Sequence, residues 1–172
     1  MATTTFNRAR SEPSLWLRYG IGGGIVAGIV FAMFEMVMAL VLNGSNAFFM
    51  PLRMIGAIGL GQSALMPSTA LVSAGGAGLV IHMVLSMMFG AIVAAVIAYV
   101  PQLSQSGTAV VVAASVAGFL LWIVNFYVLA NLFGWTWFPN DTNAAVQVVA
   151  HTFFFGSVLG LILARGFRAS RA

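Results

Sequence analysis

The chain contains no cysteine, no lysine and very little charge. Its 172 residues include seven basic and three acidic side chains, so only 6% are charged, while 61% are hydrophobic. The lack of cysteine excludes disulfides, thiolate metal ligands, a thiol nucleophile and covalently attached c-type haem. The scarcity of charge leaves little room for a soluble domain. The composition predicts helices that satisfy their own backbone hydrogen bonds in lipid.

The sequence also lacks the common active-site motifs. Residues Gly22–Gly24 lie inside an apolar run rather than between a strand and a helix, so they do not form a phosphate-binding loop. There is no HExxH or GxSxG motif, and no Ser, His and Asp set in a recognisable context. The sequence therefore predicts no catalytic activity of its own.

Four apolar runs are long enough to span a membrane, which takes about 20 residues each. They cover residues 19–42, 78–100, 108–132 and 144–164. We therefore predict an all-α membrane protein, in which residues 1–172 form one integral membrane domain. The expected architecture is a bundle of four transmembrane helices.

The arginines predict the orientation of this bundle. Six of the seven lie near the ends of the chain: Arg8, Arg10, Arg18, Arg165, Arg168 and Arg171. By the positive-inside rule both ends and the 101–107 turn are expected in the cytoplasm. The net charge of +4 then reflects topology and not affinity for nucleic acid. The long polar leader does not resemble a cleaved signal peptide, so we expect a multi-pass protein of the inner cell membrane, with an organelle membrane as the lesser alternative.

The connection between the first two spans is unusual. Residues 51–60 are apolar but too short to span, and Pro51 suits the first turn of a helix. They predict a short interfacial or re-entrant helix. Residues 62–76 are rich in small side chains and are expected to be irregular. In the 133–143 connection, Trp135, Trp137 and Phe138 are typical of an aromatic belt at a membrane surface.

Glycines four residues apart predict close helix packing. The first span carries Gly20, Gly24 and Gly28, and the fourth carries Gly156 and Gly160. Such small residues let helices approach closely in lipid, where no hydrophobic force drives association. Packing within this chain is the simpler interpretation. Docking onto another membrane subunit, or onto a second copy of the chain, is the alternative.

Each span also carries one strongly polar residue: Glu35, His82, Asn125 and His151. An ionisable side chain at membrane depth is costly, so it marks a functional site or a buried polar contact. From the rise of about 1.5 Å per residue, all four are expected roughly 6–11 Å below the far-side boundary. We predict that they converge on one layer of the bundle, supported by Gln147 and Arg53. The order Glu35, His82, Gly90 and then Asn125, His151, Gly156 further predicts two copies of one helical hairpin, unless the similarity is due to chance.

The polar layer allows three kinds of site. Imidazole is the commonest metal ligand and a carboxylate can complete the set, so His82, His151 and Glu35 are candidate ligands of a divalent metal. The two histidines are alternatively candidate axial ligands of haem b. Glu35 and a histidine are also candidates for proton transfer. The structural alternative is that each histidine hydrogen-bonds a backbone carbonyl or a neighbouring amide.

The sequence contains almost no residues that could form a soluble domain, and it contains no catalytic motif. Both observations favour a non-catalytic subunit of a larger membrane complex, of respiratory or photosynthetic type. Its partners would be the lipid bilayer and other membrane subunits, or further copies of itself. A redox or proton-transfer protein that uses the His/Glu layer is the first alternative. A small transporter or channel is the second, because the interrupted 51–61 segment resembles the broken helices that line transport sites.

Overall fold

The computed structural model describes residues 13–169, and every regular element in that range is helical. Four stretches are long and apolar enough to cross a membrane: Leu15–Asn43, Leu71–Tyr99, Gly107–Phe133 and Ala144–Gly166. They coincide with the four predicted spans. Their outer faces are apolar as well, with Val41, Val72 and Val80 among the most exposed side chains. A helix that is hydrophobic all round is typical of a membrane span and not of a helix at a water-exposed surface.

The elements follow one another in two helical hairpins. The first hairpin contains α2 (Pro13–Asn43), η1 (Ser45–Ala47), α3 (Met50–Leu60), η2 (Gln62–Leu65) and α4 (Leu71–Tyr99). The turn η3 (Pro101–Ser104) leads into the second, which contains α5 (Gly107–Ile123), η4 (Val124–Leu129), α6 (Ala130–Phe133), α7 (Trp137–Asn140), α8 (Ala144–Val149), η5 (Ala150–Ser157) and α9 (Val158–Ala169). Elements η1 to η3 are short 3₁₀ helices, whereas η4 and η5 are π-helical.

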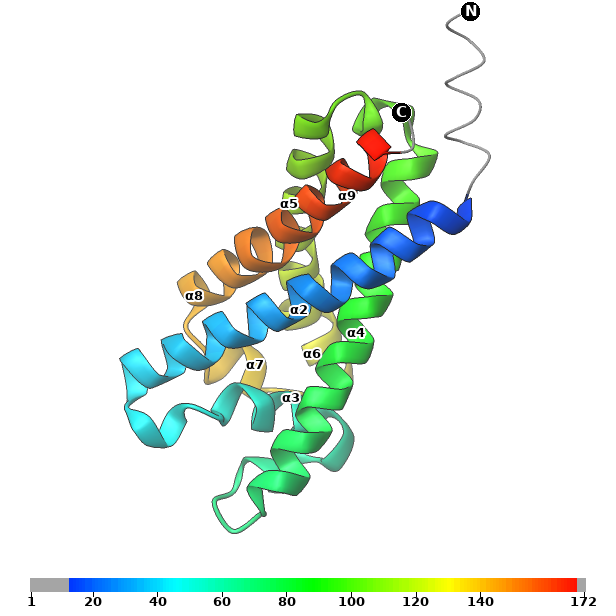
Figure 1. Ribbon diagram of the computed structural model, residues 1–172. Coiled ribbons are helices and arrows are strands. Elements are labelled where there is room, and N and C mark those ends of the chain that lie inside the picture. The colour runs from blue at the N-terminus through cyan, green and yellow to red at the C-terminus, as the bar shows by residue number, and fades with distance from the viewer. Residues whose placement is uncertain (1–12, 170–172) are drawn as a thin grey trace, which may run out of the picture.

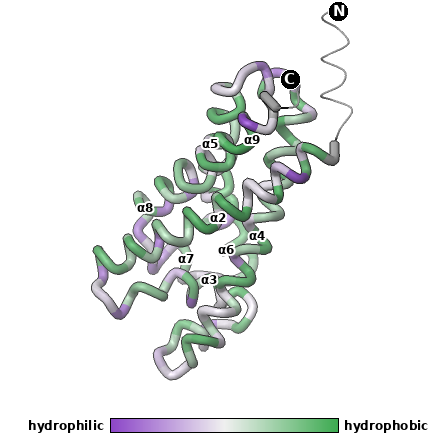
Figure 2. The backbone as a smooth tube through the Cα atoms, in the orientation of Figure 1, coloured by the Kyte–Doolittle hydropathy of each residue, from purple (hydrophilic) through white to green (hydrophobic). Residues whose placement is uncertain are grey.

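The long helices pack side by side, with α2 between α4 and the α8–α9 stretch, and with α5 against η5 and α9 (Figure 1). The beginning of α2 and the end of α9 lie at the same end of the molecule, whereas α3 and α7 lie at the other (Figure 1). Hydrophilic residues gather mainly at the two ends, and hydrophobic residues cover the middle (Figure 2). This arrangement is the one expected for an even number of passes.

Helix α4 begins seven residues earlier than predicted, so the prediction that residues 71–76 are irregular was wrong. A Cβ atom on Gly78 would overlap the carbonyl oxygen of Leu52, and one on Gly56 would overlap that of Ala74. The small residues at the start of α4 therefore let α3 approach its backbone. They provide a packing surface and do not interrupt the helix.

The predicted short helix is present as α3, with Pro51 in its first turn. It encloses a second small core together with α7 and the start of α4. The buried members of this core are Met54, Ala57, Ala64, Ala74 and Trp137. Trp137 is only 4% exposed, and its indole Nε1 donates a hydrogen bond to the Met54 carbonyl oxygen at 3.0 Å. Trp137 is therefore a core residue and not part of an exposed aromatic belt.

All five glycines of the predicted packing surfaces lie in helix contacts within the chain. On α2, a Cβ atom on Gly20 would come within 2.7 Å of Ala94 Cβ, and one on Gly28 within 2.5 Å of Ser86 Oγ. Gly24 lies equally close to the Ser86 backbone. In the second hairpin, Gly156 and Gly160 face residues 111–115 of α5 in the same way. These glycine surfaces join helices of the same hairpin.

The two hairpins repeat one contact pattern with a one-residue offset. Gly28 lies against His82 and Ser86, while Gly118 lies against His151 and Gly156. His82 and Ser86 are four residues apart in the sequence, whereas His151 and Gly156 are five apart. The difference arises because η5 is π-helical there and accommodates an extra residue. By its contacts Gly156 corresponds to Ser86, whereas the order of residues in the sequence pairs it with Gly90.

Candidate ligand site between the helices

A buried hydrogen bond joins the two hairpins at Glu35. The Gln147 amide Nε2 on α8 donates to Glu35 Oε2 on α2 at 2.8 Å. Both side chains are buried, with 8% of Glu35 and 5% of Gln147 exposed. The other carboxyl oxygen, Oε1, is also buried and has no hydrogen-bond partner among the described residues. Glu35 is therefore only partly satisfied by the protein, which is costly for a buried polar group.

Each of the two histidines is held by a backbone carbonyl. His82 Nε2 lies 2.8 Å from the Gly28 oxygen, and His151 Nδ1 lies 2.9 Å from the Gln147 oxygen. A carbonyl oxygen only accepts, so geometry assigns a proton to each of these two nitrogens. In the neutral rings His82 Nδ1 and His151 Nε2 are then hydrogen-bond acceptors. These contacts are the carbonyl bonds expected for structural histidines.

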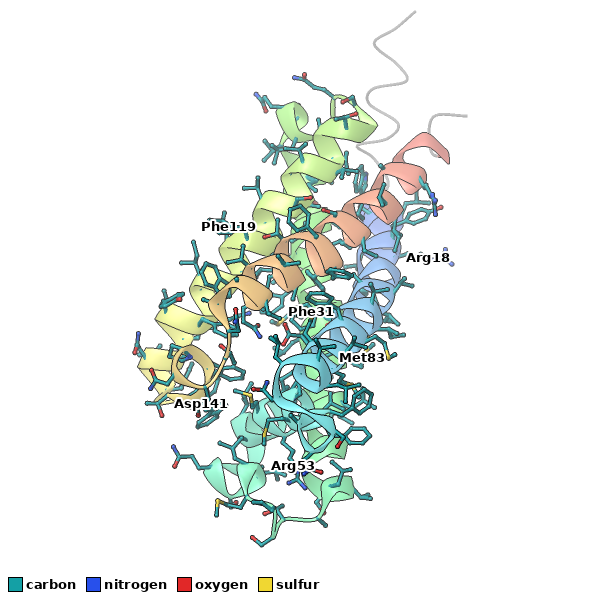
Figure 3. The ribbon with its side chains drawn as sticks, turned by 90° about the vertical axis from the view of Figure 1, so that its left-hand side faces the viewer. Arg18, Phe31, Arg53, Met83, Phe119 and Asp141 are labelled. Atoms are coloured by element: carbon teal, nitrogen blue, oxygen red, sulfur yellow. The ribbon has the colours of Figure 1, made fainter. Side chains whose placement is uncertain are left out.

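The ring of Phe31 contacts both imidazoles. It stacks on His82 with ring centroids 5.3 Å apart, and it meets His151 edge-on at 4.8 Å. Phe126 packs edge-on against His151 from another side, at 5.5 Å. Phe31 lies in the middle of the molecule, whereas Asp141 and Arg53 lie toward the end that carries the connections (Figure 3). The histidines of α4 and η5 thus meet around one aromatic side chain of α2.

A cavity of about 710 Å³ adjoins this cluster. Its wall includes the predicted polar residue of every apolar stretch: Glu35, His82, Asn125 and His151, together with Gln147. The remaining wall is mainly aliphatic and aromatic, and it extends to the exposed residues Asn43 and Asp141 at the end near α3 and α7. Pockets of about 300–1,000 Å³ with apolar walls and a few polar groups are typical of small-molecule sites. The structure therefore brings the predicted polar residues together on one cavity.

The cavity does not present a metal-binding cluster. Across residues 13–169 no three or more His, Asp or Glu side chains are placed to hold a metal ion together. The three-ligand site predicted for His82, His151 and Glu35 is not assembled. A haem would need both imidazoles to face one iron, yet the Phe31 ring packs against both. The donor set instead suits hydrogen bonding to an organic molecule.

Arg53 does not join this group, although the sequence predicted that it supports the polar layer. Its guanidinium donates to the carbonyl oxygens of Ala64 at 3.0 Å, Met66 at 3.2 Å and Thr69 at 2.9 Å. It thereby holds the turn between α3 and α4. The side chain that does meet Glu35, Gln147, was predicted only as a supporting residue.

Sequence reasoning missed the aromatic side of the site. Phe31 lies four residues before Glu35 and so on the same face of α2, which is a signal that spacing offers. The π-helical segments η4 and η5 carry Asn125 and His151. They are a frequent feature of functional sites, but nothing in the sequence indicated them.

No known protein family, curated protein or solved structure matches the chain.

Proposed function

We propose that this chain is a four-span integral membrane protein that binds a small, largely apolar molecule in the cavity between its helices. The observation that carries the proposal is the convergence of Glu35, His82, Asn125 and His151 on one cavity whose remaining wall is mainly apolar. Apolar walls would hold the body of such a molecule, and the few polar groups would orient its polar end.

The outer surface supports placement in lipid. Large hydrophobic side chains remain exposed along all four long helices, including Ile29, Val84, Val116 and Leu161. A water-soluble protein rarely exposes so much contiguous apolar surface. With both ends of the described chain at one end of the molecule and arginines at the chain termini, we place that end in the cytoplasm of the cell's inner membrane.

Membership of a respiratory or photosynthetic complex stays a prediction, and ligand binding is compatible with it. The glycine surfaces that would have favoured docking are used between helices of the chain itself. A partner subunit would therefore bind another part of the apolar surface.

Native mass spectrometry of protein extracted from its own membrane tests the proposal. Met38 lines the cavity, whereas Met33 on the same helix does not and is 53% exposed. Met38→Trp would fill part of the cavity, and Met33→Trp is its matched control. We expect a small bound molecule on the wild type and on Met33→Trp that is lost from Met38→Trp.

Three results would contradict the proposal. They are the same bound mass on all three proteins, no bound mass on any of them, or a bound mass that belongs to a bulk phospholipid. The last would show that membrane lipid merely fills the space.

A further inference from the structure

Among the described residues, the cavity is lined by two acidic side chains and by no arginine, and its basic groups are the imidazoles of His82 and His151. The acidic residues are Glu35 and Asp141. Arg53 on α3 instead donates to three carbonyl oxygens of the turn that follows α3. The neighbouring residues of α3, Leu52 and Met54, do line the cavity. The described residues therefore supply two carboxyl groups to this space without an arginine beside them, and one nitrogen of each imidazole is taken up by a backbone carbonyl.

Glu35 itself is incompletely satisfied. The residue is 8% exposed, and its carboxyl group accepts one hydrogen bond from Gln147 and leaves the buried Oε1 without a partner among the described residues. A carboxyl group in such surroundings stays ionised only where a positive group offsets its lost hydration, and it otherwise takes up a proton. A cationic ligand would provide that group.

The rest of the wall suits the apolar part of such a ligand. Aromatic side chains line the cavity on several elements, among them Phe31, Phe89, Phe126, Trp135 and Trp137. The face of an aromatic ring attracts a cation, and this attraction increases when both are removed from water. The histidine protons point to the Gly28 and Gln147 carbonyls, so the two imidazoles do not direct those protons at a ligand.

We infer that the ligand of this cavity is a lipophilic organic cation, whose positive charge lies at Glu35 and whose apolar groups pack on the aromatic wall. This inference rests on the proposed function and adds to it the charge of the ligand. Entry from the side of Asp141 would place a second carboxylate at the exposed end of the route.

Methyltriphenylphosphonium is the probe that tests this charge preference, with triphenylphosphine oxide as a neutral molecule that carries the same three phenyl groups on phosphorus. Binding of each is measured by equilibrium dialysis against the full-length protein in lipid nanodiscs, with empty nanodiscs as the baseline. We expect the wild type to bind the cation at least about 10-fold more tightly than the oxide, because only the cation offsets the buried carboxylate.

Variants then locate the effect. Glu35→Gln keeps the shape of the side chain and is expected to weaken binding of the cation about 10- to 100-fold, with little change for the oxide. Asp141→Asn removes an exposed carboxylate and is expected to change the affinity for the cation about 2-fold or less, because water and salt screen that charge. Glu35→Asp should retain the preference for the cation.

The outcomes separate this inference from the proposed function. If the wild type binds both probes equally and Met38→Trp binds neither, the inference of a cationic ligand is wrong. The proposal of a ligand-binding cavity would then still stand. Tighter binding of the oxide, retained in Glu35→Gln because the amide still donates a hydrogen bond, would overturn the cationic ligand and make Glu35 a neutral hydrogen-bond donor to an oxygen of the ligand. Binding of neither probe, or binding unaffected by Met38→Trp, would contradict both. The comparison of the two probes on the wild type needs no variant, so it holds even if Glu35→Gln fails to fold.

Discussion

Glu35 and Gln147 lie 112 residues apart in the chain and meet in its interior. Because few polar partners are available among these helices, the amide is the main group that stabilises the carboxyl. Side-chain hydrogen bonds between membrane helices contribute about 0.6 kcal/mol on average and up to roughly 1.7 kcal/mol. The contact is thus a modest contribution to stability, yet it fixes the position of the carboxyl group beside the cavity.

A double-mutant cycle tests this contact. Glu35→Ala and Gln147→Ala are each expected to lower the free energy of unfolding, and the double variant should lose less than their sum by about 0.6–1.7 kcal/mol, because the two residues share one bond. Unfolding is followed by circular dichroism in detergent titrations. Glu35→Ala combined with Ser157→Ala is the control pair and should be additive within about 0.5 kcal/mol. Strict additivity for Glu35 and Gln147 would rule the bond out.

Two hydroxyl groups of η5 should respond in opposite directions. Thr152 Oγ1 is buried and has no hydrogen-bond partner among the described residues, whereas Ser157 Oγ lies 2.8 Å from Ser115 Oγ. Thr152→Val preserves shape and should leave stability unchanged or raise it by up to about 1 kcal/mol. Ser157→Ala should lower it by about 0.5–1.5 kcal/mol. Thermal unfolding of both variants measures the difference, and a marked loss on Thr152→Val would show that its hydroxyl has a partner.

Residue spacing predicted part of the site. The polar residues were identified because each interrupts an apolar run, and Gln147 was predicted as a supporting residue of the same layer. The sequence could not show that Phe31 contacts both imidazoles, since that depends on how α2, α4 and η5 cross. It also could not show that Arg53 turns toward residues 64–69, because a guanidinium is equally well satisfied by backbone carbonyls as by a carboxylate.

At the level of the helices, neighbouring glycines in α2 should behave oppositely. A Cβ atom on Gly24 would overlap the Ser86 backbone, whereas one on Gly22 would meet nothing within 4 Å. Gly24→Ala is therefore expected to separate α2 from α4 and to cost about 1–3 kcal/mol. Gly22→Ala should stabilise the helix by about 0.5–1 kcal/mol, because alanine has the higher helix propensity.

Thermal unfolding and folded yield of the two variants check the contrast, since both make the same chemical change two residues apart. Similar destabilisation by both would mean that the Gly24 contact with α4 is not formed. Stabilisation by both would lead to the same conclusion.

The positions of the helices were predictable, and their internal geometry was not. Long apolar runs fixed the four stretches to within a few residues, except at the start of α4. There the run from Ser73 to Gly78 resembles a loop by composition, but its contacts with α3 make it helical. The π-helical segment η5 accommodates one more residue between the contacts that His151 and Gly156 make with Gly118. Hydropathy contains no signal for that extra residue.

At the scale of the whole molecule, the arginine distribution predicts which end faces the cytoplasm. The chain has no cysteine, so each single cysteine variant carries one thiol. Gln105→Cys lies in the turn between α4 and α5, and Asn140→Cys lies at the end of α7. A membrane-impermeant maleimide should label the first only in inside-out vesicles and the second only in intact cells. Labelling of both from one side would contradict the four-span arrangement.

The bond between Glu35 and Gln147 and the bond between Trp137 and Met54 both cross from the first hairpin to the second. All four of these residues also line the cavity. The cavity therefore lies along the joint where the two halves of the molecule meet. A ligand that takes over a carboxyl oxygen from Gln147 would replace a link between the halves by a link through itself. If two arrangements of the hairpins place Glu35 differently, they differ in affinity for such a ligand, and its binding shifts the balance between them.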